Sequence, residues 1–143
     1  MKRTISILIL IATLTIALSA CGMGKVKIED YEWKMRTIMH GEDNQVVVDA
    51  VGEYDTAHPE AKIVEMTLVA KDGKITITDH TNNKTYEGTY KVEQKTPAGT
   101  NYEVTIDGKE GYATVAMTTY ADGTEEPTLP INLGTHSFYF YAE

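Results

Sequence analysis

Four two-residue turn signals divide most of this chain into short segments and constrain its fold more than any other feature. They are Asp72-Gly73, Asn82-Asn83, Asp107-Gly108 and Asp122-Gly123. Asp, Asn and Gly tolerate the positive φ angles that tight β-hairpins require, so each pair predicts a hairpin turn. A chain that reverses direction this often leaves little room for long helices, and we expect an antiparallel β fold.

The segments between these turns alternate between apolar and polar residues with the period of two that β-strands show. About nine candidate strands follow, at residues 33–39, 45–51, 64–70, 75–78, 86–92, 102–107, 112–120, 128–133 and 137–142. One helical turn is predicted at residues 56–62, and His58-Pro59 restricts where it can begin. Consecutive hairpins predict an all-β, up-and-down meander that closes into a small barrel, because closure removes exposed sheet edges. A β-sandwich is the alternative.

The beginning of the chain is apolar and almost uncharged. Met1-Lys2-Arg3 is followed by an uncharged run over residues 4–24. A basic start, an apolar stretch and then small residues are typical of a secretory signal. The segment Leu18-Ser19-Ala20-Cys21 resembles a bacterial lipobox, which implies attachment of a diacylglycerol to Cys21 and cleavage before it. The alternative is an uncleaved transmembrane anchor, since a membrane-spanning helix needs about 20 residues.

We therefore expect three parts: a lipoprotein signal peptide at residues 1–20, a lipidated N-terminus and short spacer at 21–30, and a β-barrel domain at 31–143. The lipid on Cys21 would hold the domain at the bacterial cell envelope, outside the cytoplasm, because two acyl chains anchor a protein stably. Cys21 is the only cysteine of the chain, so a disulfide cannot form within it.

The predicted mature chain is strongly acidic. Removal of residues 1–20 takes away Lys2 and Arg3 and leaves 11 basic against 21 acidic residues, a formal charge of about −10. Nucleic-acid binding needs cationic side chains that displace counterions from phosphates, and this balance opposes it. The acidity suits a cationic protein partner, or simply keeps the domain soluble.

The residue inventory argues against an enzyme. After the predicted cleavage the chain keeps one serine, Ser137, and no Gly-x-Ser-x-Gly elbow surrounds it. Adjacent residues of a strand point to opposite faces, so His136 could not act as the base for Ser137. No two carboxylates stand out as a glycosidase pair. We expect no catalytic residue and no cofactor.

Three short motifs place an imidazole near a carboxylate. They are His40-Gly41-Glu42-Asp43, His58-Pro59-Glu60 and Asp79-His80. None has the His-x-His or His-Glu-x-x-His spacing of metal sites, and the calcium-loop pattern is absent from the sequence. All three fall in predicted turns or loops, and we expect no metal site.

Aromatic residues are concentrated in the predicted strands. Tyr86, Tyr90, Tyr102 and Tyr112 fall on the apolar phase of three consecutive strands and are expected to share one face of the sheet. Tyrosine combines apolar area with a hydroxyl group, so such a face could line an amphipathic pocket. With Trp33, these tyrosines are the candidate ligand-binding residues. The alternative is that the rings only fill the barrel.

Three segments carry a family resemblance: EWKMRTI near the mature N-terminus, KTYEGTYKV in the middle and SFYFYA at the end. With them, residues 31–143 resemble small bacterial lipoproteins with a lipocalin-like, calycin-type barrel. In lipocalins a tryptophan of the first strand, two residues after a glycine, plugs the barrel base under a late arginine. The resemblance assigns that role to Trp33, but Tyr31 stands at the glycine position and Arg36 is the only arginine after the signal.

Two functional hypotheses follow. The leading one is a non-enzymatic, lipid-anchored envelope protein that binds a small or extended ligand in an aromatic-lined barrel. The alternative is a protein-interaction module, such as an inhibitor of a cationic hydrolase like lysozyme. Small bacterial lysozyme inhibitors are also acidic lipoproteins with β-barrel domains, although their Ser-Gly-x-x-Tyr motif is absent from this sequence.

Overall fold

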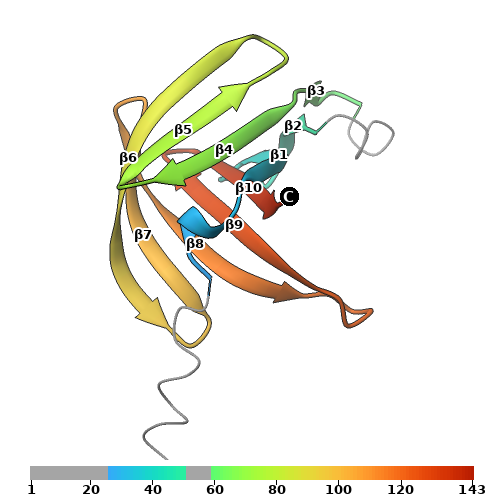
Figure 1. The fold of residues 1–143 in the computed structure, drawn as a ribbon. Helices are drawn as coiled ribbons and strands as arrows, with labels where there is room; N and C mark the ends of the chain where they lie inside the picture. The colour runs from blue at the N-terminus through green and yellow to red at the C-terminus, as the bar shows by residue number, and fades with distance from the viewer. Residues whose placement is uncertain (1–25, 51–58) are drawn as a thin grey trace, which may run out of the picture.

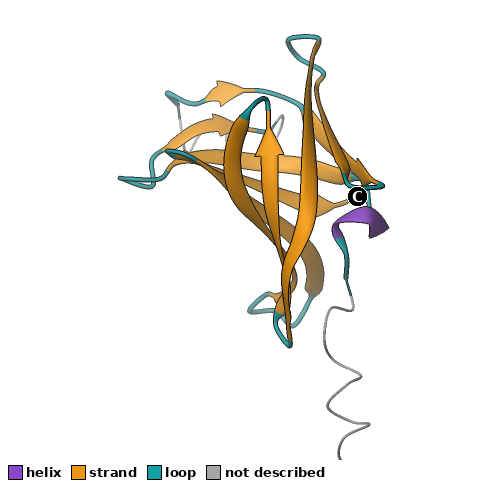
Figure 2. Ribbon diagram, turned by 90° about the vertical axis from the view of Figure 1, so that its left-hand side faces the viewer, coloured by secondary structure: helices purple, strands orange, loops and turns teal. Residues whose placement is uncertain are grey.

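The structure is a computed structural model that describes residues 26–50 and 59–143. A short 3₁₀ helix, η1 (Ile28–Asp30), precedes ten strands. The strands are β1 (Trp33–His40), β2 (Val46–Asp49), β3 (Lys62–Ile63), β4 (Met66–Lys71), β5 (Lys74–Asp79), β6 (Lys84–Thr96), β7 (Gly99–Ile106), β8 (Lys109–Thr119), β9 (Glu125–Leu133) and β10 (His136–Ala142). Within the described residues η1 is the single helical element (Figure 2).

Eight antiparallel strands form a closed barrel (Figure 1). Strands β4 to β10 pair in sequence order, and β1 completes the ring by pairing with β4 on one side and β10 on the other. Every strand of the ring therefore has two neighbours, which leaves no open sheet edge there. The predicted all-β meander closed into a barrel is confirmed, and the alternative sandwich is not observed.

Strands β2 and β3 lie outside the ring. The first half of β1 pairs with β4, whereas its second half pairs with β2 in an antiparallel register that includes Thr37 and Asp49. Strand β3 then pairs with β2 in parallel. The sequence did not predict β3. Of the predicted helical turn at 56–62, residues 56–58 lie outside the described residues. The described part is wrong as a helix, because residues 59–61 form a turn and a bend and Lys62 already belongs to this strand.

The predicted turns are confirmed by their backbone angles. Both residues of Asp72-Gly73 and of Asp107-Gly108 have positive φ, as do Asn83 and Gly123. Each of the first two pairs is the whole connection between consecutive strands, β4 to β5 and β7 to β8. Such two-residue loops match the right-handed twist of the strands they join.

The barrel has two different ends. The loops 80–83, 107–108 and 134–135 lie at one end, which we call the mouth. The loops 72–73, 97–98 and 120–124 lie at the other, which we call the base, together with η1. Between them the inward-facing residues form one apolar core, which includes Trp33, Leu68, Val115, Leu129 and Phe140.

Candidate functional site

The base of the barrel is closed by the residues that precede β1. The Trp33 Nε1–H donates a hydrogen bond to the carbonyl oxygen of Ile28 at 2.7 Å, and the Ile28 N–H donates one to the Tyr102 hydroxyl at 3.2 Å. Ile28 and Trp33 are fully buried. Residues 28–30, which we expected to belong to the spacer, therefore form η1 and plug the barrel, because Ile28 is apolar and both its backbone groups find partners inside.

A second contact joins η1 to the wall. The hydroxyl of Tyr90 donates a hydrogen bond to a carboxylate oxygen of Glu29, and the Tyr90 ring meets the Tyr102 ring edge to face at 5.8 Å. Burial and the hydrogen bond to Glu29 raise the pKa of Tyr90 to about 12. Burial also raises the pKa of Tyr102. Both tyrosines thus keep their hydroxyl protons at pH values at which an exposed tyrosine would be deprotonated.

We expect the domain to lose stability as the pH rises from about 10 to about 12. An unfolded tyrosine titrates near pH 10, whereas the pKa of Tyr90 in the folded protein is about 12. Between these values the unfolded chain has released the proton that the folded protein still holds, so rising pH favours unfolding. Below about pH 10 Tyr90 is protonated in both the folded and the unfolded state, and its contribution to stability is fully present. Thermal unfolding followed by circular dichroism over this range measures the effect.

Tyr90→Phe should make this decline shallower, because the ring stays and the titrating hydroxyl is removed. Tyr112→Phe is the matched control, since the Tyr112 ring lies exposed on the outer face. An equal decline in Tyr90→Phe and the unmodified protein would show that Tyr90 is not linked to folding.

A cavity of about 200 Å³ lies at the mouth of the barrel. Its walls are apolar and aromatic, formed by Met66, Ile77, Tyr86, Ile106, Leu133 and Phe138. Asp107, Lys109 and His136 complete its rim. An apolar interior with a few polar groups at its entrance is the usual composition of a small-molecule site.

The structure divides the five candidate ligand-binding residues among three places. Only Tyr86 lines the cavity. Trp33, Tyr90 and Tyr102 belong to the plugged base, where their polar atoms bond to Ile28 and Glu29. Tyr112 is 60% exposed and lies on the outer face.

The prediction that Tyr112 shares a face with the other tyrosines is wrong. In β8 the buried residues are Ala113 and Val115, so Tyr112 has the opposite phase. It pairs across the strands with Glu103 and Asn132, which are not buried either. Gly111 and Ala113 are too small to show in the sequence that their positions face inward. The alternation therefore predicts the larger Tyr112 on the inward face instead.

Sequence reasoning missed most of the cavity wall. Met66, Ile77 and Ile106 are visible in the sequence as apolar members of alternating strands, but nothing local distinguishes them from core residues. A usable signal is their position, because each lies close to a loop of the mouth. Where loops of one barrel end leave the interior unplugged, such residues can line a cavity while still packing in or against the core, as Ile77 and Ile106 do.

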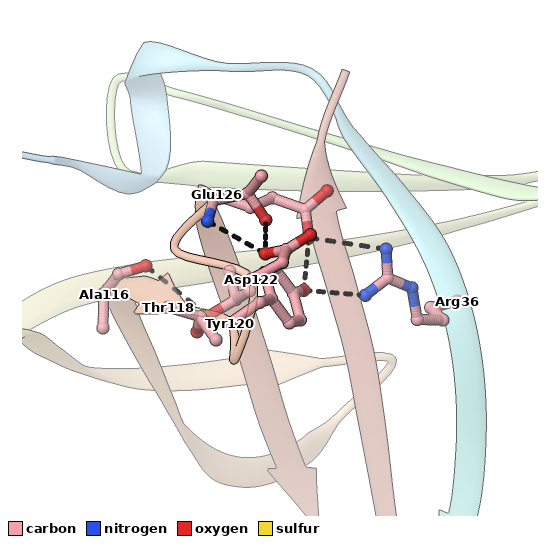
Figure 3. Close-up of polar contacts among 8 residues, drawn as sticks. Arg36, Ala116, Thr118, Tyr120, Asp122 and Glu126 are labelled. Atoms are coloured by element: carbon pink, nitrogen blue, oxygen red, sulfur yellow. Dashed lines mark hydrogen bonds and ion pairs between the residues drawn. The ribbon is translucent and has the colours of Figure 1, made fainter.

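Arg36 lies on the outer surface and spans the seam between the first and last strands (Figure 3). Its Nη1–H donates to the Tyr120 hydroxyl at 2.9 Å, and its Nη2 lies 3.4 Å from a Glu126 carboxylate oxygen. The guanidinium stacks 4.5 Å above the Tyr141 ring, and the Tyr120 hydroxyl donates to Glu126 at 2.5 Å. Arg36 thus ties β1 across β10 to β9 and to Tyr120, which follows β8.

The two imidazole–carboxylate motifs whose histidines the structure describes form ordinary polar contacts near strand ends. His40 Nδ1 lies 3.2 Å from an Asp43 carboxylate oxygen, and His80 Nε2 lies 2.9 Å from the Thr67 hydroxyl. His58 lies outside the described residues, as do residues 1–20 and Cys21. Among residues 26–50 and 59–143, no group of three or more His, Cys, Asp or Glu side chains is placed to hold a metal ion. That same part of the chain contains no helix long and apolar enough to cross a membrane.

Comparison with known proteins leaves the site to be interpreted from its own geometry. No family model, curated protein or solved structure matches the chain.

Proposed function

We propose that this protein is a non-enzymatic, lipid-anchored lipoprotein of the bacterial cell envelope, with a lipocalin-like barrel that binds a small, largely apolar ligand. The observation that carries the proposal is the apolar cavity at the mouth, lined by Ile77, Tyr86 and Phe138 among others. The opposite end is plugged by η1, so a ligand enters and leaves through the mouth.

The volume of the cavity limits the size of the ligand. Pockets for drug-sized molecules occupy about 300–1,000 Å³, whereas this cavity occupies about 200 Å³. An apolar cavity of about 150 Å³ stays dry and binds benzene or xenon. The ligand is therefore small, or it inserts one apolar group and leaves the remainder outside.

The rim offers polar partners to the exposed end of such a ligand. Lys109 and His136 can donate hydrogen bonds, and Asp107 can accept them. The single hydroxyl among the apolar and aromatic wall residues belongs to Tyr86. This distribution suits a molecule with an apolar body and a polar end.

The anchor rests on the lipobox-like segment that ends at Cys21. Two acyl chains on one residue hold a protein stably at a membrane, whereas a single chain binds only marginally. The domain would then remain on the outer side of the membrane that its signal peptide crosses.

Titration of the isotopically labelled domain with benzene tests the cavity. Saturable NMR shifts of the Ile77 and Ile106 methyl groups are expected, because both side chains line the cavity. Met66→Trp should weaken benzene binding at least about tenfold, equivalent to about 1.4 kcal/mol, since the indole would occupy the same space. Met66 is only partly buried, so the larger ring can be accommodated at the mouth.

Met117→Trp is the matched control, because Met117 lies at the base and is exposed. It should leave benzene affinity unchanged. Absence of saturable shifts in the unmodified protein, together with no ligand detected by native mass spectrometry of the protein from its host, would overturn the proposal. Equal weakening by both substitutions would also contradict it.

A further inference from the structure

We propose that the barrel stands on its membrane with the base toward the bilayer, so that the cavity faces away and receives its ligand from the aqueous side rather than from the anchoring leaflet. The inference rests on the proposed lipidation of Cys21 and on the proposed binding cavity. It narrows the ligand class, because lipids of the anchoring membrane would not reach the mouth directly.

The chain enters the domain at the base. Ile28 is fully buried there, and hydrogen bonds to Trp33 and Tyr102 hold both its carbonyl and its N–H. Glu29 bonds to Tyr90 in the wall beside it. A pull on the residues that precede Ile28 therefore acts on the base and not on the mouth.

The connection to the lipid is short. Cys21 lies seven residues before Ile28, and seven residues span at most about 25 Å when fully extended. To turn the mouth toward the bilayer, this segment would have to leave the base, pass around its edge and run along the outer wall to the mouth. The wall from Tyr90 to Lys84, six residues of β6, accounts for about 20 Å along the strand, or about 15 Å along the axis of a barrel whose strands tilt by about 40°.

The β6–β7 and β8–β9 hairpins project on the side of the base (Figure 1). Val92 follows the inward phase of Tyr86 and Tyr90 yet is 50% exposed, and Met117 follows buried Val115 yet is 43% exposed. Inward-phase side chains become exposed only where their strands have run past the packed interior. The tips of β6–β7 and β8–β9 are thus the parts of the base that can reach the bilayer surface.

The surface of the base suits a membrane interface better than the walls do. Among residues 26–50 and 59–143, five of the eight large exposed apolar or aromatic residues lie in the half of the barrel nearest the base: Tyr31, Val69, Val92, Met117 and Tyr120. Tyrosine is favoured at membrane–water interfaces. The acidity of the whole domain, in contrast, disfavours laying a wall against anionic headgroups. Contact limited to the hairpin tips keeps the walls away from the headgroups and leaves Glu93, Asp122 and Glu125 as the acidic residues of the tips.

Two variants of the full chain, each with one cysteine in addition to Cys21, test the orientation. Lys84→Cys and Lys95→Cys replace exposed lysines at the mouth and base ends of the same strand. Eleven residues of strand correspond to about 36 Å, or about 28 Å along the axis of a barrel whose strands tilt by about 40°. Each variant is labelled with a fluorescent donor and bound to vesicles of phosphatidylglycerol and phosphatidylethanolamine that contain an acceptor lipid.

Energy transfer should be several-fold stronger from position 95 than from position 84. Equal transfer from both positions, or stronger transfer from position 84, would overturn the proposed orientation. Mass spectrometry of Cys21 and membrane fractionation are recorded on the same preparations. A protein without lipid on Cys21 that stays in the soluble fraction would instead refute the proposed anchor, so the two failures are distinguishable.

Discussion

Trp33→Ala is expected to lower the free energy of unfolding by about 3–5 kcal/mol, the range for removal of a buried aromatic side chain. Trp33 is fully buried, and its Nε1–H holds the carbonyl of Ile28. The substitution therefore removes a large part of the core and also releases the plug η1 from the base. Trp33 is the only tryptophan, so urea unfolding followed by circular dichroism, rather than by fluorescence, measures the change.

Trp33→Phe separates the two contributions. Phenylalanine keeps an aromatic ring but has no donor for the Ile28 carbonyl, whose loss of a partner costs about 1–3 kcal/mol. Tyr112→Ala serves as the control, because an exposed side chain on the outer face should change stability by no more than about 0.5 kcal/mol. If Trp33→Ala is as mild as Tyr112→Ala, Trp33 does not close the barrel base.

Gly111→Ala is expected to destabilise the barrel by about 1–3 kcal/mol, the usual cost of overpacking a well-packed site. A Cβ atom at Gly111 would lie 2.0 Å from the carbonyl oxygen of Asn132 and 2.8 Å from a Leu133 methyl group. The first of these neighbours is backbone, so β8 and β9 would have to separate. Denaturant unfolding of the purified variant measures the loss.

Gly41→Ala is the matched control. The nearest atom to its added Cβ is the Thr135 carbonyl oxygen at 3.3 Å, which a small shift can relieve. Gly41→Ala should therefore be clearly milder than Gly111→Ala. Equal effects would mean that loss of glycine flexibility, rather than the close approach of β8 to β9, determines the cost.

Much of the fold could be predicted because its signals are local. The positive φ angles of Asp72, Asn83 and Asp107 follow from residue types that tolerate them. The alternation around Ile75 and Ile77 predicts β5 within one residue at each end, Lys74–Asp79. Both signals depend on residues that are neighbours in the chain, so a single sequence is sufficient to reveal them.

The prediction for β6 shows where local signals fail. The sequence predicted a strand at 86–92, whereas β6 (Lys84–Thr96) is 13 residues long. An irregularity between Val92 and Gln94 interrupts the alternation. Beyond it the hairpin no longer covers the core, so its residues need not be apolar on either face and the periodic signal disappears.

The candidate site depended on information that no single strand contains. Tyr86 and Tyr90 have the same phase on β6, yet one lines the cavity and the other belongs to the plugged base. Their roles differ because η1 occupies only one end of the barrel. Its hydrogen bond to Tyr102 joins residues 74 positions apart.

The sequence by itself therefore determined the turns, most strands, the all-β class and the acidic balance, because residue type and spacing govern these directly. Only the tertiary structure decided the closure of β1 against β10, the plug formed by Ile28 and the cavity at the mouth. These features depend on contacts between distant segments and on the register that brings them together. The single cysteine stays a prediction of lipid attachment, and the buried Ile28 seven residues after it now shows which end of the barrel the N-terminal segment enters.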